Sequence, residues 1–232
     1  EAGFGADLGA EKFLNIKCRK SNIKPSCVVI DATIRALKMH GGIEKANLKN
    51  ENVDALKKGL VNLERHINNI KKFSLTPVVA INSFILDTKK EISAVKDFCK
   101  NQKVEVSEST HWANGGKGAK DLAKKVVKIC KNSKKKNFKF LYKDDQSLWS
   151  KVETIAKEIY KASSITADDN VKKQLKIFED NGYGKLPVCI AKTQYSFSVD
   201  PKLKGAPSGH EISIREVRLS SGAEFIVVVC GS

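Results

Sequence analysis

The chain contains 232 residues, 41% of them hydrophobic, and carries a formal net charge of +16. This length is enough for one large domain or for one and a half ordinary ones, and the hydrophobic share is enough for a buried core, which excludes a disordered tail. No run of 18 or more apolar residues occurs, so the sequence predicts no membrane-spanning helix and no membrane partner.

The basic charge balance suggests a nucleic-acid partner, but the type of basic residue argues against one. Only 5 of the 42 basic residues are arginine and the other 37 are lysine. Proteins that read base edges depend on arginine, whose planar fork matches guanine. Lysine, asparagine and isoleucine all have AT-rich codons, so genome composition explains much of the charge. The densest lysine cluster, at residues 134–136, follows an expected helix, whose dipole it would offset. We expect no nucleic-acid partner.

The first half of the chain alternates strand and helix patterns. Short apolar or β-branched runs predict strands over residues 27–30, 77–81 and 104–106. Apolar residues at three-to-four spacing and related patterns predict helices over residues 34–39, 52–73, 88–100 and 119–131. This order is typical of an α/β fold with a parallel, doubly wound sheet.

The second half is less regular. Helices are expected over residues 146–160 and 168–180, and strands over residues 186–190, 212–217 and 225–229, the last two as neighbours. A loop rich in proline, glycine and lysine spans residues 200–209. The irregular alternation does not fix a topology.

Three loops follow the expected parallel strands and should meet at one edge of the sheet, where α/β proteins bind ligands. They lie after Ile30, at residues 82–88 and at residues 111–118. The third reads His-Trp-Ala-Asn-Gly-Gly-Lys-Gly and leads into a helix whose N-terminus favours anions. An anion site beside Trp112 suits a nucleotide or a folate, although such a turn can also merely connect a strand to a helix.

Six cysteines are scattered along the chain without a C-x-x-C pair. Their spacing indicates neither a metal site nor a disulfide framework, so we expect reduced thiols in a cytoplasmic protein and no metal ligands.

Several longer motifs carry more information than these patterns. Residues 1–13 read Glu-Ala-Gly-Phe-Gly-Ala-Asp-Leu-Gly-Ala-Glu-Lys-Phe, and residues 32–42 read Ala-Thr-Ile-Arg-Ala-Leu-Lys-Met-His-Gly-Gly. Further motifs occupy residues 82–88, 111–118, 186–189, 191–198, 200–207 and 215–218. Together they cover nearly the whole chain, and in content and order they resemble the formate–tetrahydrofolate ligase (10-formyltetrahydrofolate synthetase) family.

The resemblance implies a fold and a reaction. Residues 1–137 would be the carboxyl-terminal part of a P-loop-type parallel-sheet domain that binds nucleotide and folate, and residues 138–232 a smaller α/β domain, truncated at its end. The family joins formate to tetrahydrofolate at the expense of ATP, through formyl phosphate, and releases 10-formyltetrahydrofolate, ADP and phosphate. It further implies Mg²⁺, a monovalent cation (K⁺ or NH₄⁺), small-molecule substrates and a cytoplasmic homotetramer.

The family's phosphate-binding loop is not found here. No G-x-x-x-x-G-K-[ST] motif occurs in the 232 residues, which begin without methionine and end in a strand-like run. We expect a fragment that lacks the P-loop segment and is inactive by itself, because that loop supplies the backbone amides and lysine that grip phosphates.

Four residues are assigned to folate by the resemblance. Phe84 and Trp112 match the two aromatic residues that sandwich the pterin ring, and Asp87 and Phe4 join them. Two flat faces hold a heterocycle well. Each aromatic side chain could instead belong to the core, and Asp87 could cap the helix that begins near Thr88.

The resemblance assigns nucleotide binding to two glycines of the third loop and to a later segment. That segment resembles the one that closes over the nucleotide in members of the family. These residues are Gly115, Gly116, Lys192, Gln194, Gly205, Ala206 and Pro207. An exposed connection would have a similar composition. No catalytic residue is assigned, and His40 is interpreted as a loop or packing residue, because formyl transfer needs mainly positioning and charge neutralisation.

Some residues depart from the family pattern. Asp31 directly follows the expected strand, at a position where the family usually keeps an apolar residue in its strand, and would need partners if buried. Ile85 and Leu86 replace a more polar pair. One alternative hypothesis is therefore a non-catalytic relative that retains a folate- or anion-binding fold. The basic charge leaves a second alternative, a nucleic-acid or polyanion binder whose affinity falls steeply with salt.

Overall fold

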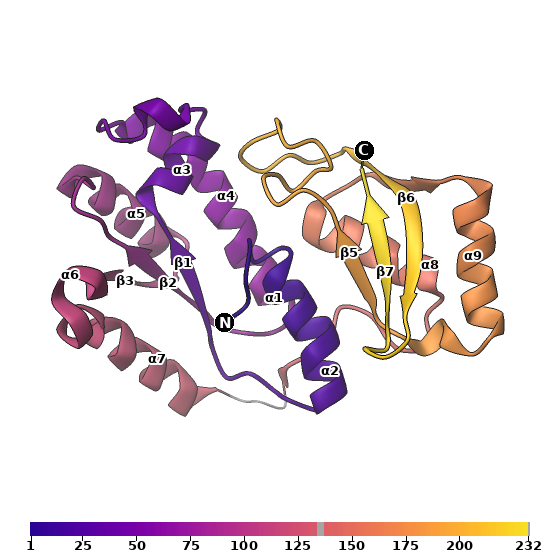
Figure 1. Ribbon diagram of the computed structural model, residues 1–232. Helices are drawn as coiled ribbons and strands as arrows, with labels where there is room; N and C mark the ends of the chain where they lie inside the picture. The colour runs from indigo at the N-terminus through magenta and orange to yellow at the C-terminus, as the bar shows by residue number, and fades with distance from the viewer. Residues whose placement is uncertain (134–136, 232) are drawn as a thin grey trace. The chain divides into compact units, whose positions relative to one another are not determined.

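A computed structural model describes residues 1–133 and 137–231 (Figure 1). The chain forms two compact units: a parallel-sheet unit, Lys24–Phe138, and a mixed-sheet unit, which combines Glu1–Ile23 with the chain from Lys139 onward. The expected boundary after residue 137 falls beside the junction at Phe138, but the first 23 residues group with the carboxyl-terminal half. The lysine cluster at residues 134–136 lies outside the described residues.

The parallel-sheet unit has three strands in the order β1 (Val28–Ala32), β2 (Pro77–Asn82) and β3 (Glu105–Ser109). All pair in parallel, with Val79 of β2 opposite Ile30 and Val106. This confirms the expected α/β class and the three expected strands. Every residue of β2 except Asn82 is buried, whereas β1 alternates, which leaves Asp31 exposed. Asp31 therefore avoids the burial that its position in a strand suggested.

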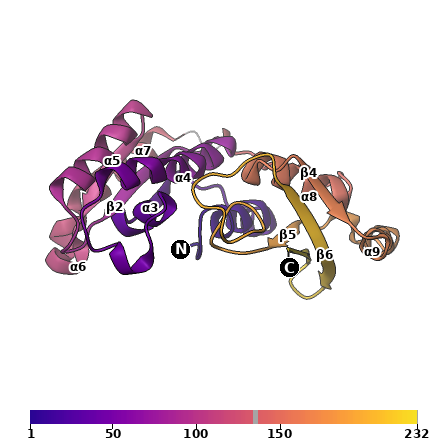
Figure 2. The ribbon, with the colours of Figure 1, turned by 90° about the horizontal axis from the view of Figure 1, so that it is seen from above.

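Helices connect and cover these strands (Figures 1 and 2). They are α3 (Ile34–His40), α4 (Val53–Lys72), α5 (Lys89–Asn101) and α7 (Lys120–Asn132). Helices α4 and α5 pack against each other and against the sheet, while α7 packs on β2 and β3. Side chains of Thr33, Asn52 and Thr88 cap the first three helices by accepting backbone N–H bonds.

Glycines explain how α3 and α4 come so close. A Cβ on Gly59 would lie 1.8 Å from the Leu37 carbonyl oxygen, and one on Gly41 would lie 1.8 Å from that of Ala55. Only glycine permits such an approach of two backbones. The motif at residues 32–42 is thus partly a packing motif, and it fixes α3 at the edge of the sheet where β1 ends.

The mixed-sheet unit has four strands in the order β4, β6, β7 and β5, with bounds Ser164–Ala167, Glu211–Ser220, Phe225–Cys230 and Val188–Ala191. Strands β6 and β7 form an antiparallel pair, as expected for neighbours, while β4 and β5 join in parallel. The unit also contains helix α8 (Leu148–Ile155), which continues as a π-helical turn Ala156–Tyr160, and helix α9 (Asp169–Asp180).

The amino-terminal segment forms a helix that the sequence patterns did not predict. It comprises α1 (Gly9–Lys12), a π-helical turn (Phe13–Lys17) and α2 (Cys18–Ser21). The π turn interrupts the three-to-four spacing, which hides the amphipathic pattern. Strand β4 was also missed, because it is short and only Ile165 of its four residues is buried.

Candidate ligand site at the carboxyl edge of the parallel sheet

The carboxyl ends of β1, β2 and β3 meet at one edge, as the sequence predicted. The loop after β2 and the end of β3 are joined directly, since the Ser83 N–H donates to the Ser109 carbonyl oxygen at 3.0 Å. The side-chain oxygen of Asn82 is buried here without a hydrogen-bond partner among the described residues. A buried acceptor of this kind normally finds a donor, so a ligand N–H would satisfy it.

Phe84 and Trp112 form an aromatic pair at this edge. Their ring centroids are 6.4 Å apart and their planes are inclined by 24°. The Trp112 indole N–H donates to the Ser83 carbonyl oxygen at 3.0 Å, which fixes the ring, yet the residue is 54% exposed. A flat ring inserted between two others needs about 7 Å, twice the optimal carbon–carbon distance of roughly 3.5 Å. The two rings would therefore have to move apart slightly to hold a heterocycle between them.

The turn after β2 is built around Asp87. Its carboxylate accepts the Phe84 N–H at 2.8 Å, and its own N–H donates to the Phe84 carbonyl at 3.0 Å. Burial raises the pKa of this carboxyl, partly offset by the bond from Phe84. The turn thus places Phe84 beside Trp112. The cap of α5 belongs to Thr88, so the alternative in which Asp87 is the cap is wrong.

A buried carboxylate behind this turn was missed by the sequence analysis. Glu91 is 0% exposed and accepts hydrogen bonds from the N–H groups of Asn52 at 3.0 Å and Thr88 at 3.2 Å. Its Oε1 also lies 2.9 Å from the Lys38 ammonium, which donates to the Asn50 carbonyl at 2.8 Å. Glu91 therefore ties together α3 and the starts of α4 and α5.

Part of this arrangement is visible in the sequence. Thr88-x-x-Glu91 is the spacing of a capping box, in which the two side chains exchange hydrogen bonds with each other's backbone amides. The contact with Lys38 depends on how α3 packs, so no local pattern indicates it. Lys38 lies in the motif at residues 32–42, which gives that motif a second structural role.

The third loop is more ordered than expected. It contains a helical turn, α6 (His111–Asn114), followed by a 3₁₀ turn over Gly115–Ala119. Gly115 has a φ of +54°, and a Cβ on either Gly115 or Gly116 would meet no atom within 4 Å. These two glycines leave open space, whereas a Cβ on Gly118 would lie 2.5 Å from the Thr110 backbone.

The N-terminus of α7 already has a negative charge nearby. Asp121 stands in its first turn and accepts hydrogen bonds from the Ser107 hydroxyl and the Lys125 ammonium, each at 2.6 Å. These bonds lower the pKa of Asp121. A ligand anion at this helix end would meet that carboxylate, and the assignment of Gly115 and Gly116 to the nucleotide stays a prediction.

The remaining assigned residues belong to the mixed-sheet unit. The Lys192 side chain is fully buried, 3.4 Å from the Asp7 carboxylate, and donates to the Ser196 carbonyl. Burial lowers the pKa of Lys192, and Asp7 opposes that shift. Gln194 is exposed, Gly205 is buried, and Ala206 and Pro207 are half-buried. Here Lys192 serves the fold, and its role with a nucleotide stays a prediction.

Lys192 belongs to a buried cluster that holds the amino-terminal helix. Its ammonium lies 4.5 Å from the Tyr160 ring centroid, and the Tyr160 hydroxyl donates to the Asp7 carbonyl at 3.0 Å. Glu11 accepts from the Asn15 amide at 2.6 Å, and burial raises the pKa of its carboxyl to about 7. This cluster explains why the motif at residues 1–13 folds with the later half of the chain.

Phe4 also lies in the mixed-sheet unit. It is 79% exposed and its backbone adopts a φ of +62°, a conformation that costs energy for a bulky residue. The structure thus brings together Phe84, Trp112 and Asp87, while the assignment of Phe4 to folate stays a prediction.

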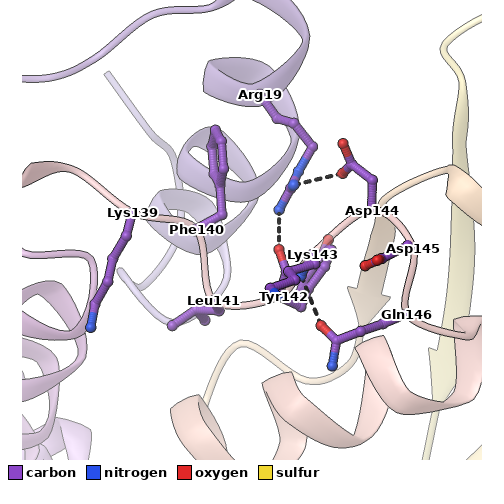
Figure 3. A pocket seen from close by; sticks show the side chains of 9 residues that line it. All are labelled: Arg19, Lys139, Phe140, Leu141, Tyr142, Lys143, Asp144, Asp145 and Gln146. Atoms are coloured by element: carbon purple, nitrogen blue, oxygen red, sulfur yellow. Dashed lines mark hydrogen bonds and ion pairs between the residues drawn. The ribbon is translucent and has the colours of Figure 1, made fainter. Parts of the chain in front are cut away.

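A separate hollow in the mixed-sheet unit is lined by residues 139–146 and Arg19 (Figure 3). Arg19 donates to the Asn15 carbonyl at 2.9 Å, the Asp144 carboxylate at 2.6 Å and the Tyr142 carbonyl at 2.9 Å. Its guanidinium carbon also lies 4.0 Å from the Phe140 ring centroid. Because each of its nitrogens is engaged, Arg19 holds this segment to the amino-terminal helix.

Within residues 1–133 and 137–231, no group of three or more His, Cys, Asp or Glu side chains could hold a metal ion. Across the same residues, no helix is long and apolar enough to cross a membrane.

An open parallel sheet, covered by helices and carrying two stacked aromatic residues beyond its strand ends, defines an α/β domain. The family model for formate–tetrahydrofolate ligase matches residues 1–232. A relative of that name from Pelagibacter ubique is 64% identical over 232 residues, and one from Ruegeria pomeroyi is 58% identical over 231. The chain belongs to the formate–tetrahydrofolate ligase family. The matches cover all of this chain but 41% of each relative.

Proposed function

We propose that the protein carrying this chain joins formate to tetrahydrofolate in an ATP-dependent reaction that yields 10-formyltetrahydrofolate, ADP and phosphate. The observation that carries the proposal is the Phe84–Trp112 pair, with centroids 6.4 Å apart, in a chain that matches the family over residues 1–232. The pair would hold the pterin ring, and the Asn82 oxygen and the Asp87 carboxylate would meet its N–H edge.

The proposed chemistry proceeds in two steps. ATP transfers its γ-phosphoryl group to a formate oxygen, which gives formyl phosphate and ADP. N10 of tetrahydrofolate then attacks the formyl carbon, the C–O bond to phosphate breaks, and the N10 proton is released. Residues of this chain would act by holding the pterin so that N10 faces the formyl carbon, because orientation supplies a large share of such rate enhancements.

We extend the proposal to the nucleotide and to the assembly. Gly115 and Gly116 would admit a phosphate close to the backbone. The other residues that would serve the nucleotide are Lys192, Gln194, Gly205, Ala206 and Pro207. Mg²⁺ would accompany ATP, a monovalent cation would assist, and the protein would work as a cytoplasmic homotetramer. The support for the nucleotide residues, the cations and the assembly is the match of the chain to the family.

The test is product formation by the full protein that carries this chain. With ATP, formate and tetrahydrofolate present, 10-formyltetrahydrofolate should accumulate, and omission of any one substrate should abolish it. Product can be measured as the methenyl derivative formed on acidification. A protein that binds tetrahydrofolate without turnover would instead be a non-catalytic family member. One that binds neither tetrahydrofolate nor ATP would contradict the proposal.

A further inference from the structure

Two free cysteines lie at the amino edge of the parallel sheet, where its strands begin. Cys27 directly precedes β1, and the N–H of the next residue, Val28, donates to the Thr76 carbonyl oxygen at 3.3 Å. Cys130 belongs to the last turn of α7. The Cys27 side chain is half-buried and the Cys130 side chain is exposed.

Polar contacts show that α7 runs back along β3 toward this edge (Figure 1). The first turn of the helix is bonded to the middle of the strand. Further along the helix, the Lys125 ammonium donates to the Val106 carbonyl oxygen at 2.7 Å. The Lys128 ammonium then lies 3.7 Å from the carboxylate of Glu105, the first residue of the strand. Cys130 follows Lys128 in the helix, so it lies where the strand begins.

Cys27 lies on the face of the sheet that α7 covers. Side chains alternate along a strand, so Cys27 and Val29 share a face. Val29 is opposite Val78 of β2, and Val78 is opposite Glu105 of β3. Residues paired in this way in a parallel ladder have their side chains on the same face. Because Lys128 contacts Glu105 there, the two cysteines approach each other from β1 and from α7.

The two thiols also interact electrostatically. Burial raises the pKa of the Cys27 thiol to about 11, and the negative charge that Cys130 can carry contributes to this rise. A like charge has such an effect only when it is close. The raised pKa keeps Cys27 protonated near neutral pH, which makes it a poor nucleophile, whereas the exposed Cys130 is accessible to reagents in solution.

We propose that Cys27 and Cys130 form a site of oxidative modification, at which a peroxide converts the two thiols into a disulfide that ties α7 to the start of β1. This inference is independent of the proposed reaction. None of the residues of α7 is buried, so the helix is held to the sheet by half-buried side chains and by its polar contacts with β3. A covalent link would therefore add to the stability of this part of the unit.

The different exposure of the two thiols sets the order of the steps. The Cys130 thiolate attacks a peroxide oxygen, an S–O bond forms as the O–O bond breaks, and the leaving oxygen takes up a proton. The Cys27 sulfur then attacks the resulting sulfenic acid, an S–S bond forms, and the S–O bond breaks. The leaving hydroxide takes the Cys27 proton and becomes water. The two thiols lose two electrons, which the peroxide gains.

The experiment treats the full protein that carries this chain with hydrogen peroxide, blocks the remaining thiols with N-ethylmaleimide and analyses the peptides by mass spectrometry. The variants are Cys27→Ser and Cys130→Ser. Cys189→Ser is the matched control, since Cys189 is also half-buried but belongs to the mixed-sheet unit. The linked peptide is measured in the parent protein, so this readout does not depend on whether a variant folds.

A peptide pair joined through Cys27 and Cys130 should appear in the parent and in Cys189→Ser, and dithiothreitol should remove it. In Cys27→Ser, dimedone should trap Cys130 as a sulfenic acid, whereas in Cys130→Ser the thiol of Cys27 should remain reduced. The disulfide should raise the melting temperature by about 5 °C or more, because it closes a long loop. Cys130 that resists peroxide, or that is oxidised without being joined to Cys27, would overturn the proposal.

Discussion

Replacing Lys38 with methionine tests whether the buried ion pair with Glu91 organises the ligand site. The Lys38 and Glu91 side chains are 2% and 0% exposed, and their charged atoms are 2.9 Å apart. Methionine retains much of the apolar stem but leaves the Glu91 carboxylate without its cation. Removing one partner of a buried pair typically costs about 3–5 kcal/mol, because the remaining charge stays buried and uncompensated.

The structure narrows this magnitude. Glu91 would keep the hydrogen bonds from the N–H groups of Asn52 and Thr88, which stabilise its charge, so the loss should lie near the lower end, about 3 kcal/mol. Lys90→Met is a matched control in α5, the helix that carries Glu91. Lys90 is 78% exposed and 3.4 Å from Glu51, so water screens that pair and its loss should have a far smaller effect.

The effect should depend on pH in a defined direction. Burial acts to raise the pKa of Glu91, but the bonds from Asn52, Lys38 and Thr88 outweigh it and hold the pKa below its usual value. A carboxyl with a lowered folded-state pKa contributes stability above its unfolded pKa of about 4.3 and loses it as the pH falls through the folded pKa. The difference between the parent and Lys38→Met should therefore be largest near neutral pH and narrow in acid.

Urea unfolding followed by tryptophan fluorescence measures this difference. The chain has two tryptophans, Trp112 in the parallel-sheet unit and Trp149 in the other, so a Trp149→Phe background lets Trp112 report on its unit alone. The reasoning is refuted if Lys38→Met costs no more than Lys90→Met, or if its effect is the same at pH 4 as at pH 7.

Three further changes test other parts of the account. Trp112→Ala should weaken tetrahydrofolate binding by about 1–3 kcal/mol in equilibrium titrations, which is the loss found when an aromatic residue that stacks on a nucleic-acid base is replaced by alanine. The affinity for ATP should stay nearly unchanged. Equal losses of both affinities, with a lower melting temperature, would make Trp112 a structural residue. Glu11→Gln should raise the melting temperature more at pH 8 than at pH 5. Burial raises the folded-state pKa of Glu11 to about 7, so the buried carboxyl destabilises the protein progressively as the pH rises from the unfolded-state pKa of about 4.3 through 7. An equal shift of the melting temperature at both pH values would argue against this account. Neutralising the exposed Lys57, Lys58 and Lys71 on α4 should leave the tetrahydrofolate KM within about twofold, and a larger, salt-sensitive change would show that the long-range field steers the ligand.

The sequence by itself determined the order of strands and helices in the parallel-sheet unit and the edge where the ligand site lies. Strand β2 is buried at five of its six positions, so it reads as a continuous apolar run, and α4 repeats apolar residues every three to four positions. Both patterns involve residues that are close together in the sequence, so the strand and the helix can be predicted without knowledge of tertiary contacts. Because parallel strands end on one side, they also brought the loops of Phe84 and Trp112 together.

Only the tertiary structure decided how the motifs cooperate. The helix at Gly9–Ser21 contains a π turn, and its place with the later half of the chain depends on contacts of Asp7 with Tyr160 and Lys192. Likewise, the packing of α3 brings Lys38 into an ion pair with Glu91, and a hydrogen bond to the Ser83 carbonyl fixes the orientation of the Trp112 ring. Such contacts join residues far apart in sequence, whose pairing is selected by packing and burial of charge, and no local periodicity records that selection.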